Sequence, residues 1–195
     1  MPSTVVIGGA GRTGRHIVER LLRDGAAVKV LSRNPDHVPD GVDAVVVVVE
    51  SAMNDDASPN GPTAVHDEGS RHVVSAAAPD THVVMVSQIY ITRPEAFPAA
   101  AEIIAARGRG EQALRDSGLP YTIVRPSWLT DEPGGRQALR LEQGDTGDGK
   151  VSREDVAEAV VQALAHPQAR GKTFELYGEP GEPPADWGPL FDALR

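Results

Sequence analysis

Short apolar runs alternate with amphipathic stretches along the chain. The first run, Val5-Val6-Ile7, is wholly apolar and β-branched, which is typical of a strand buried on both faces of a parallel sheet. The same pattern predicts further strands at 28–31, 44–49, 82–86, 121–124 and 173–177. The run 44–49 is the most apolar of these, so we expect it to be central in the sheet.

Helical periodicity fills the intervals between these runs. Apolar residues from Ile17 to Leu22 lie on one face of a helix predicted over 15–23, and Gly25 is placed to end it. Further helices are predicted at 63–78, 99–117, 152–165 and 187–194. Strands alternating with helices indicate an α/β fold, a Rossmann-like doubly wound parallel sheet. Two polar, turn-rich stretches, 53–62 and 131–150, are predicted as loops.

Composition narrows the class of protein. A chain of 195 residues suits one domain (1–195), with smaller substrate-side elements expected over about 126–195. The net charge of −9 argues against nucleic-acid binding and against docking on anionic membranes. The absence of cysteine excludes disulfides, thiolate metal sites and a cysteine nucleophile, and the histidines show no paired metal spacing. With no apolar run of ~20 residues and no basic leader, we expect a soluble cytoplasmic protein, and the sequence leaves a homodimer open.

A glycine-rich turn joins the first strand to the first helix. Gly8, Gly11 and Gly14 allow a tight bend, close approach of a pyrophosphate and close packing of the helix on the strand. Arg12 and Thr13 lie between them, at the positive end of the helix dipole. The motif predicts a dinucleotide site formed by these five residues; the alternative is a glycine-rich connection that binds no ligand.

A basic residue follows the second predicted strand. Where NAD-preferring sites carry an acidic residue that binds the ribose hydroxyls, this sequence has Arg33, and an arginine there accommodates a 2′-phosphate. The sequence therefore predicts NADP(H) in preference to NAD(H). The alternative is a solvated surface arginine.

Three segments together resemble a known family. They are 5–31 with its GGAGRTG turn, 111–126 (EQALRDSGLPYTIVRP) and 151–157 (VSREDVA). In these segments the chain resembles the NmrA-like atypical short-chain dehydrogenases, the NAD(P)H-binding group near biliverdin-reductase-B-like proteins. The resemblance implies a Rossmann sheet and NADP(H) binding. In many members it also implies reduction of small carbonyl or quinone-like compounds, whereas others sense the cofactor without turning over a substrate.

The chain departs from that family in two places. Residues 32–43 leave no room for the family's third strand and its helix, so the sheet is predicted to lack this outer edge strand. A direct connection is feasible because about a dozen extended residues span ~40 Å. Glu50 ends the predicted central strand, where relatives place a small residue beside the cofactor. It is a candidate to bind a ribose hydroxyl or the substrate, or it is an ordinary loop residue.

The candidate catalytic residues form an incomplete set. Ser87 ends the strand 82–86 and Tyr90 follows it, so both are candidates to polarise or protonate a substrate carbonyl. The lysine that would lower the tyrosine pKa is missing, because Pro94 stands at the expected spacing after Tyr90. Arg107 replaces the family lysine; it can orient the cofactor ribose but cannot shuttle a proton. For Ser87 the alternative is a hydrogen-bonding role beside the nicotinamide of the cofactor, and for Tyr90 that of an ordinary loop aromatic residue.

The segment after the strand 121–124 resembles the part of the family that passes the nicotinamide. The resemblance implies cofactor contacts for Arg125 and Pro126, and a substrate pocket walled by Ser127 and Trp128. Gln88, next to Ser87, is assigned to the same pocket. Trp128 is either the roof of this pocket or a core aromatic residue.

Residues 145–155 superficially resemble a calcium loop. Aligning the glycine places Gly144 and Thr146 where carboxylates are needed, so we favour a helix N-terminus capped by Ser152, with Asp155 facing back. The sequence thus favours an NADP(H)-dependent reductase of small carbonyl or quinone-like compounds. The alternatives are a non-catalytic cofactor sensor and a non-redox isomerase on the same scaffold.

Overall fold

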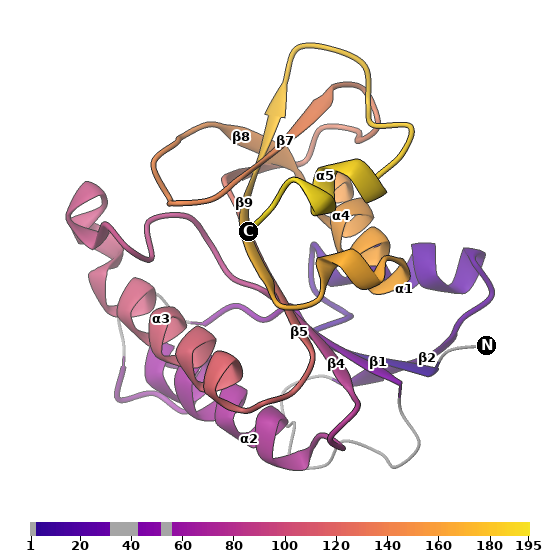
Figure 1. The fold of residues 1–195 in the computed structure, drawn as a ribbon. Helices are drawn as coiled ribbons and strands as arrows, with labels where there is room; N and C mark the ends of the chain where they lie inside the picture. The colour runs from indigo at the N-terminus through magenta and orange to yellow at the C-terminus, as the bar shows by residue number, and fades with distance from the viewer. Residues whose placement is uncertain (1–2, 32–42, 52–55) are drawn as a thin grey trace.

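A mostly parallel sheet forms the centre of the computed structural model, which describes residues 3–31, 43–51 and 56–195 (Figure 1). The strands run in the order β2-β1-β3-β4-β5-β9-β7, and only β7 is antiparallel to its neighbour. Their bounds are β1 Ser3–Ile7, β2 Ala27–Leu31, β3 Ala44–Val47, β4 His82–Val86, β5 Tyr121–Pro126, β7 Ala138–Glu142 and β9 Lys172–Glu179. The predicted α/β, Rossmann-like sheet is confirmed, and the run 44–49 contributes β3, a buried interior strand next to the central strand β4.

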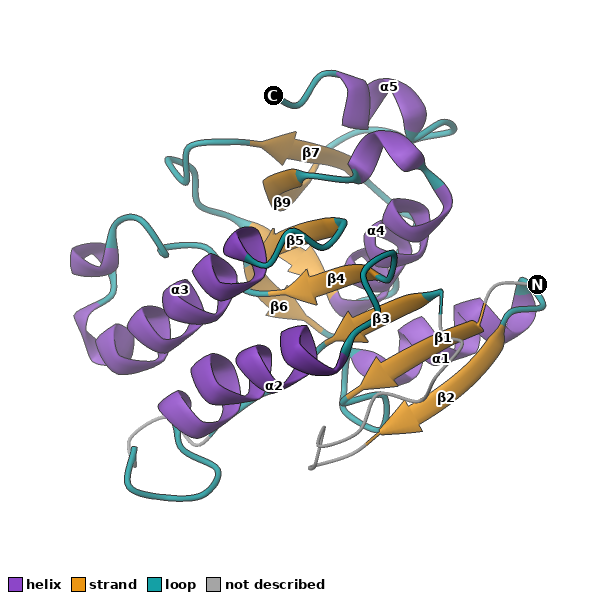
Figure 2. Ribbon diagram, turned by 60° about the horizontal axis from the view of Figure 1, so that its bottom comes forward, coloured by secondary structure: helices purple, strands orange, loops and turns teal. Residues whose placement is uncertain are grey.

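Helices cover both faces of this sheet (Figure 2). One face carries α1 (Gly14–Arg23) and α4 (Arg153–Ala165), and the other carries α2 (Gly69–Ala76) and α3 (Ala101–Asp116). Alternating strand residues explain the two layers: Val6 faces the α1/α4 cluster, whereas Val5 and Ile7 face the α2/α3 cluster. A π-helical turn precedes α2, short 3₁₀ turns flank α3 and α4, and α5 (Gly188–Asp192) follows β9.

β2 forms one edge of the sheet, where the family's third strand was predicted to be missing. Within the described residues no strand lies beyond β2, which pairs with β1 alone. The connection at 32–42 lies outside the described residues. β1 has β2 on one side and β3 on the other, so successive strands are added in opposite directions from β1. Rossmann sheets bind their ligands at such a switch point.

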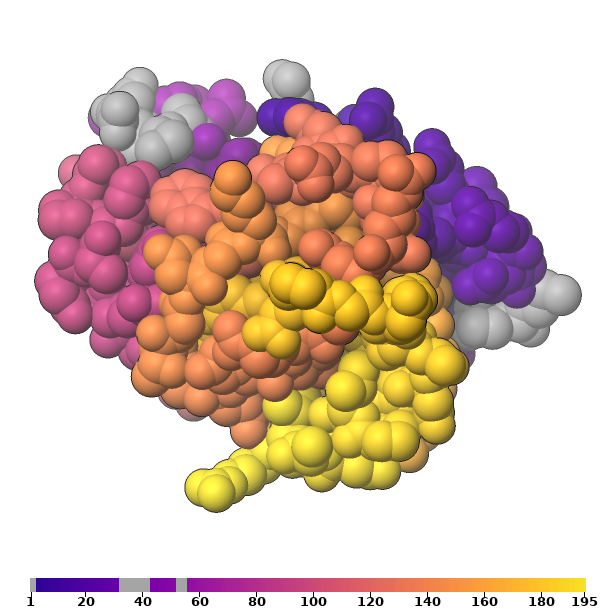
Figure 3. Space-filling model, turned by 90° about the horizontal axis from the view of Figure 1, so that it is seen from above, coloured from indigo at the N-terminus to yellow at the C-terminus, as the bar shows by residue number. Residues whose placement is uncertain are grey.

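The predicted loop 131–150 is partly wrong. It contains β7, which extends the main sheet by pairing with β9, and its last residue begins β8 (Lys150–Ser152). The strand escaped prediction because its alternating Ala138-Leu139-Arg140-Leu141-Glu142 lies within a stretch rich in Gly and Asp. Its Arg140 pairs with Glu142 and Glu179. A separate ribbon joins β8 to β6 (Trp128–Thr130). Figure 3 shows these late segments gathered on one face of the molecule.

The start of α4 is capped as predicted. Ser152 Oγ accepts a hydrogen bond from the Asp155 N–H at 2.9 Å and donates one to Asp155 Oδ2 at 2.8 Å. The other carboxylate oxygen of Asp155 accepts from the Gly135 N–H at 2.7 Å, so this carboxylate is engaged within the protein. Across the described part of the chain, every helix is too short or too polar to span a bilayer.

Candidate functional site

The turn after β1 requires its glycines. Gly8 has a φ of +84°, and a Cβ at this position would lie 2.1 Å from the Val48 carbonyl oxygen. A Cβ on Gly14 would lie 2.2 Å from the Gly8 carbonyl oxygen. The Gly11 N–H donates to that same oxygen at 2.9 Å, which closes the turn. The backbone therefore bends as tightly as a pyrophosphate-binding turn requires.

Helix α1 begins without a capping side chain or an acidic residue at its positive end. Its cap residue, Thr13, makes no side-chain hydrogen bond to the helix, and the first turn contains no acidic residue. The first N–H groups of a helix lack partners within it, and they attract anions together with the helix dipole. This helix end lies at the glycine turn and suits a phosphate group.

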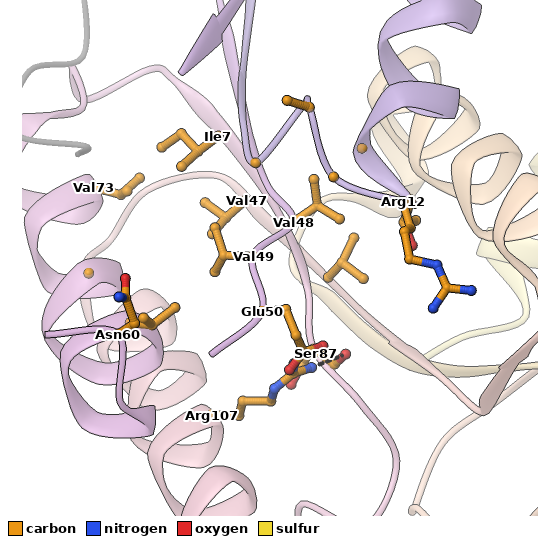
Figure 4. A pocket seen from close by; sticks show the side chains of 18 of the residues that line it. Ile7, Arg12, Val47, Val48, Val49, Glu50, Asn60, Val73, Ser87 and Arg107 are labelled. Carbon is orange, nitrogen blue, oxygen red and sulfur yellow. Dashed lines mark hydrogen bonds and ion pairs between the residues drawn. The ribbon is translucent and has the colours of Figure 1, made fainter. Parts of the chain in front are cut away.

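A cavity of about 720 Å³ lies against the glycine turn (Figure 4). Its volume is in the range of cofactor sites. Nine of the residues predicted to bind cofactor line it: Gly8, Gly11, Arg12, Thr13, Gly14, Glu50, Ser87, Arg107 and Pro126. The structure thus brings these residues together, and their contact with a cofactor stays a prediction. Arg33, which carries the predicted NADP(H) preference, lies outside the described residues.

Arg12 is held by an acidic neighbour. Its guanidinium donates to Asp131, and the second oxygen of Asp131 accepts from Arg153 Nη1 at 2.8 Å. The side chains of Arg12 and Asp131 are both well exposed. Both arginines line the cavity, so the phosphate end of the site contains two cations that share one carboxylate.

A second cavity of about 360 Å³ adjoins the first. Gln88, Tyr90, Ser127 and Trp128, the four residues predicted to wall the substrate pocket, all line it. Six residues line both cavities: Glu50, Ser87, Arg107, Pro126, Leu129 and Arg153. The two cavities therefore lie side by side, so a ligand bound at the glycine turn can extend toward the smaller cavity.

Unpartnered polar atoms concentrate at that second cavity. Five buried side-chain nitrogen or oxygen atoms of the described residues lack a hydrogen-bond partner, and three of them belong to residues lining it: Ser87 Oγ, Ser127 Oγ and Arg107 Nε. Leaving a buried polar group unpaired is costly, so native proteins retain such groups mainly where a ligand or water satisfies them. All three can donate to an oxygen atom, as a carboxamide or carbonyl ligand requires.

Arg107 is fixed between the two cavities. Its Nη1 donates to the Ser87 carbonyl oxygen at 2.8 Å, and its Nη2 donates to Glu50 Oε1 at 2.9 Å (Figure 4). Arg107 is buried, whereas the side chain of Glu50 is 69% exposed. Glu50 is thus the counter-ion of Arg107 and still faces the solvent side of the site.

Three aromatic rings form a wall of the smaller cavity: Tyr90, Phe97 and Trp128. The Trp128 Nε1–H donates to the Tyr90 hydroxyl at 3.2 Å, and Phe97 meets Trp128 edge-on with ring centroids 5.1 Å apart. Trp128 is 45% exposed, so the alternative of a core aromatic residue is wrong. Burial raises the pKa of the Tyr90 phenol above its ordinary value. Tyr90 is therefore poorly suited to donate a proton.

The structure does not place the Arg125 side chain at the implied cofactor contact. The Arg125 guanidinium binds both oxygens of Glu111, at 3.1 and 2.7 Å, and Glu175 Oε1 at 2.9 Å. Burial opposes its charge, but the hydrogen bonds and charges of the two glutamates outweigh this and raise the pKa of Arg125. Arg125 lines neither cavity; it is the centre of a buried ion cluster beneath the site.

Sequence reasoning missed two contributors to the site. Phe97 lies in a Pro-rich stretch with no period, so nothing in the pattern marked it as part of the aromatic wall. Asp145 lies in a stretch predicted as a loop, yet its carboxylate is buried and binds the Tyr90 N–H at 2.8 Å. One feature of the sequence draws attention to Asp145, because it is the first residue of the apparent calcium loop.

Comparison with known proteins agrees with this geometry. Among curated relatives, the (4-alkanoyl-5-oxo-2,5-dihydrofuran-3-yl)methyl phosphate reductase of Streptomyces griseus is 32% identical over 199 residues, covering 89% of this chain and 67% of the relative. The sanguinarine reductase of Eschscholzia californica is 36% identical over 123 residues, covering 58% of this chain and 45% of the relative. Against one Arabidopsis thaliana relative the match spans only 13% of that protein. The chain thus spans less than half of the length of some relatives.

Solved structures share the fold. The oxidoreductase YlbE of Lactococcus lactis superposes with a TM-score of 0.77 at 18% identity, over 92% of each chain. A Veillonella parvula short-chain dehydrogenase/reductase in complex with NADP gives a TM-score of 0.69 at 19% identity, over 95% of this chain and 99% of that one. The model of the NAD(P)H-binding family matches residues 8–167. The chain therefore belongs to the NAD(P)H-binding family, as its resemblance to the atypical short-chain dehydrogenases implied.

Proposed function

We propose that this protein is an NADPH-dependent reductase of small, flat carbonyl or quinone-like compounds. One observation carries the proposal: the cavity at the glycine turn shares lining residues with a smaller, aromatic-lined cavity, and three residues lining the smaller one carry unpaired donors. Two relatives are named as reductases, which supports the same reaction class. A flat ring system suits a wall made of Tyr90, Phe97 and Trp128.

The chain's own residues would bind and polarise the substrate. A nicotinamide dinucleotide held at the glycine turn would supply a hydride to the carbonyl carbon of the substrate, whose oxygen would then gain negative charge. Ser87 Oγ, Ser127 Oγ and Arg107 Nε are the donors available to that oxygen as its negative charge develops. Arg107 keeps its charge throughout, so water supplies the proton that completes the alcohol. Tyr90 contributes its ring to the wall.

NADP(H) is the proposed cofactor. The support is Arg33 at the position that distinguishes the two dinucleotides, together with Arg12 near the phosphate end of the cavity. The test is calorimetric titration with NADPH and NADH, with Arg33→Asp as the control variant. We expect tighter binding of NADPH by the unmodified protein and loss of that preference in Arg33→Asp. Tighter binding of NADH by the unmodified protein would reject the preference.

Turnover tests the reaction. NADPH oxidation is followed with a panel of quinones, aldehydes and ketones, where saturable activity is expected. Ser127→Ala should lower kcat by about 100-fold, the usual cost of losing one donor to a developing oxyanion. Ser75→Ala is the matched control, because this serine lies exposed on α2 and binds the His72 carbonyl. Full activity of Ser127→Ala would remove Ser127 from the proposed donors.

A cofactor sensor is the second candidate. It is favoured by Arg107, which is buried, paired with Glu50 and unable to act as a proton shuttle in place of the family lysine. Tight NADPH binding with no oxidation across the whole panel would favour this function over the reductase.

A further inference from the structure

Two strained residues of the described chain are bonded to each other. Among described residues other than glycine, positive φ values occur at Tyr90, with +74°, and Asp145, with +53°. Such conformations are sparsely populated and persist only where the surrounding structure enforces them. The Asp145 carboxylate accepts the Tyr90 N–H at 2.8 Å, although 55 positions separate the two residues. The two strained sites therefore form one unit.

Asp145 holds the entire turn after β4 and not only one residue of it. Its Oδ1 accepts the Tyr90 N–H, while Oδ2 accepts the Thr92 N–H at 2.9 Å and the Thr92 hydroxyl at 3.1 Å. Asp145 is 1% exposed, so these three hydrogen bonds replace its hydration. Arg93, whose Nε lies 3.8 Å from Oδ1, is the cation nearest to the carboxylate.

The backbone of Asp145 is itself anchored in the buried ion cluster. The Asp145 N–H donates to Glu175 Oε2 at 3.0 Å, and Glu175 Oε1 accepts from Arg125. Arg125 also binds Glu111 on α3 through two hydrogen bonds. A continuous chain of polar contacts thus runs from α3 through β5 and β9 to the turn that carries Tyr90.

That turn sets the geometry of the aromatic wall. The Tyr90 ring lies 6.1 Å from the Trp128 ring and 6.2 Å from the Phe97 ring, measured between centroids. The Tyr90 hydroxyl accepts the indole N–H of Trp128, so the placement of Tyr90 also orients Trp128. Any shift of the Tyr90 backbone changes the wall of the smaller cavity.

We propose that Asp145 is a positioning residue that determines specificity, because it locks the Tyr90 turn and with it the aromatic wall that receives a flat substrate. Asp145 does not line either cavity and acts only through Tyr90 and Thr92. The consequence for substrate recognition rests on the proposed reductase function, whereas the consequence for the wall does not. Three donors converge on the two oxygens, so a side chain with two acceptor oxygens is needed at this position.

The experiment uses Asp145→Asn in the whole chain of 195 residues. The amide keeps the size of the side chain but turns an NH₂ group toward one or two of the three donors. A Trp187→Phe background leaves Trp128 as the only tryptophan, so its fluorescence reports on the wall directly. Asp80→Asn is the matched control, because Asp80 is exposed in the turn before β4.

Three measurements are made on each variant: acrylamide quenching of Trp128, NADPH affinity by calorimetry, and kinetics with a naphthoquinone. In Asp145→Asn we expect about a tenfold rise in KM, because the Tyr90 turn loses the hydrogen bonds that hold it and the aromatic wall shifts. Quenching of Trp128 should change clearly, and the NADPH affinity should stay within about twofold because the glycine turn is untouched. Asp80→Asn should match the parent in all three.

The outcomes separate this inference from the proposed function. Altered quenching in Asp145→Asn with normal NADPH affinity supports the inference, even if no variant and no parent turns over a substrate. A lower melting temperature with unchanged quenching and KM overturns it and leaves Asp145 a purely structural residue. If Asp145→Asn does not fold, Thr92→Val decides, because it removes only the 3.1 Å bond from the hydroxyl. In Thr92→Val, a small change in the quenching of Trp128 supports the inference, and unchanged quenching overturns it.

Discussion

The two ends of the combined cavity are built by opposite means. At the glycine turn, close contact depends on missing side chains, since any Cβ on Gly8 would meet the Val48 carbonyl. At the Tyr90 turn, a strained backbone is held by a buried carboxylate and an ion cluster. The first end is specified locally, by glycines three residues apart, whereas the second needs residues from distant parts of the chain. This difference predicts how each end fails.

The largest effect is expected at the glycine turn. Gly8→Ala places a methyl group 2.1 Å from the Val48 carbonyl oxygen in a residue with a φ of +84°. The positive φ and the overpacking should each cost about 1–3 kcal/mol, and NADPH binding should be lost. Calorimetry and urea denaturation measure the two effects. Gly108→Ala is the control, because its Cβ would make only a 3.5 Å contact with Ile91. NADPH affinity equal to that of the parent would contradict the role of this turn.

A comparable loss is expected when the ion cluster is broken. Arg125→Met leaves Glu111 and Glu175 without their central cation, and removal of one partner of a buried pair costs about 3–5 kcal/mol. Urea denaturation measures the free energy of unfolding. Burial already raises the pKa of Glu175, so the destabilisation should be smaller at acidic pH, where this carboxyl takes up a proton. The same loss at every pH would contradict a charge-based role.

A smaller, gradual loss of unfolding free energy is expected as the pH falls. Burial lowers the pKa of His82, which begins β4 and binds Thr122, to about 4. The unfolded chain therefore takes up the proton first as the pH falls below 6.5, and the folded protein loses about 1.4 kcal/mol per pH unit until its own pKa near 4. Burial also lowers the pKa of His66, to about 2, so His66 adds a loss of the same size per pH unit over this range and continues it to lower pH.

The variant His82→Gln tests this directly. Glutamine can still donate to Thr122 but does not titrate, so the slope of unfolding free energy against pH between 6.5 and 4 should become shallower. Urea denaturation across that range gives the slope. A variant with the parent's slope would show that His82 is not the group responsible. NADPH affinity, set at the opposite end of the strands, should not follow this change.

The smallest effect is expected from Tyr90→Phe. The hydroxyl accepts one hydrogen bond from Trp128 and is not needed as an acid in the proposed reaction. Its loss should cost about 0.5–1.5 kcal/mol of stability and change kcat by less than about threefold. Steady-state kinetics with a quinone measures this. A fall in kcat of about 100-fold would instead make Tyr90 the proton donor.

The features predicted correctly from the sequence are local ones, and the features missed depend on contacts between distant residues. The glycine turn, the apolar strands and the Ser152 cap depend on residues within a few positions, so they were predicted correctly. Arg125 was assigned to the cofactor through its place in the family segment, but its partners Glu111 and Glu175 lie far apart in sequence. β7 and Asp145 escaped for the same reason, because an edge strand within a Gly-rich stretch or a buried carboxylate is recognised only when its distant partner is known.

Asp131 gives the phosphate end an internal counter-ion. A dinucleotide that binds Arg12 would compete with this carboxylate for the same guanidinium, so part of the electrostatic gain is offset by the pair that is lost. Arg153 would keep Asp131 in place during such an exchange. Dinucleotide affinity should consequently vary less with ionic strength than it would at an arginine with no acidic neighbour, since salt weakens the competing pair as well as the new one.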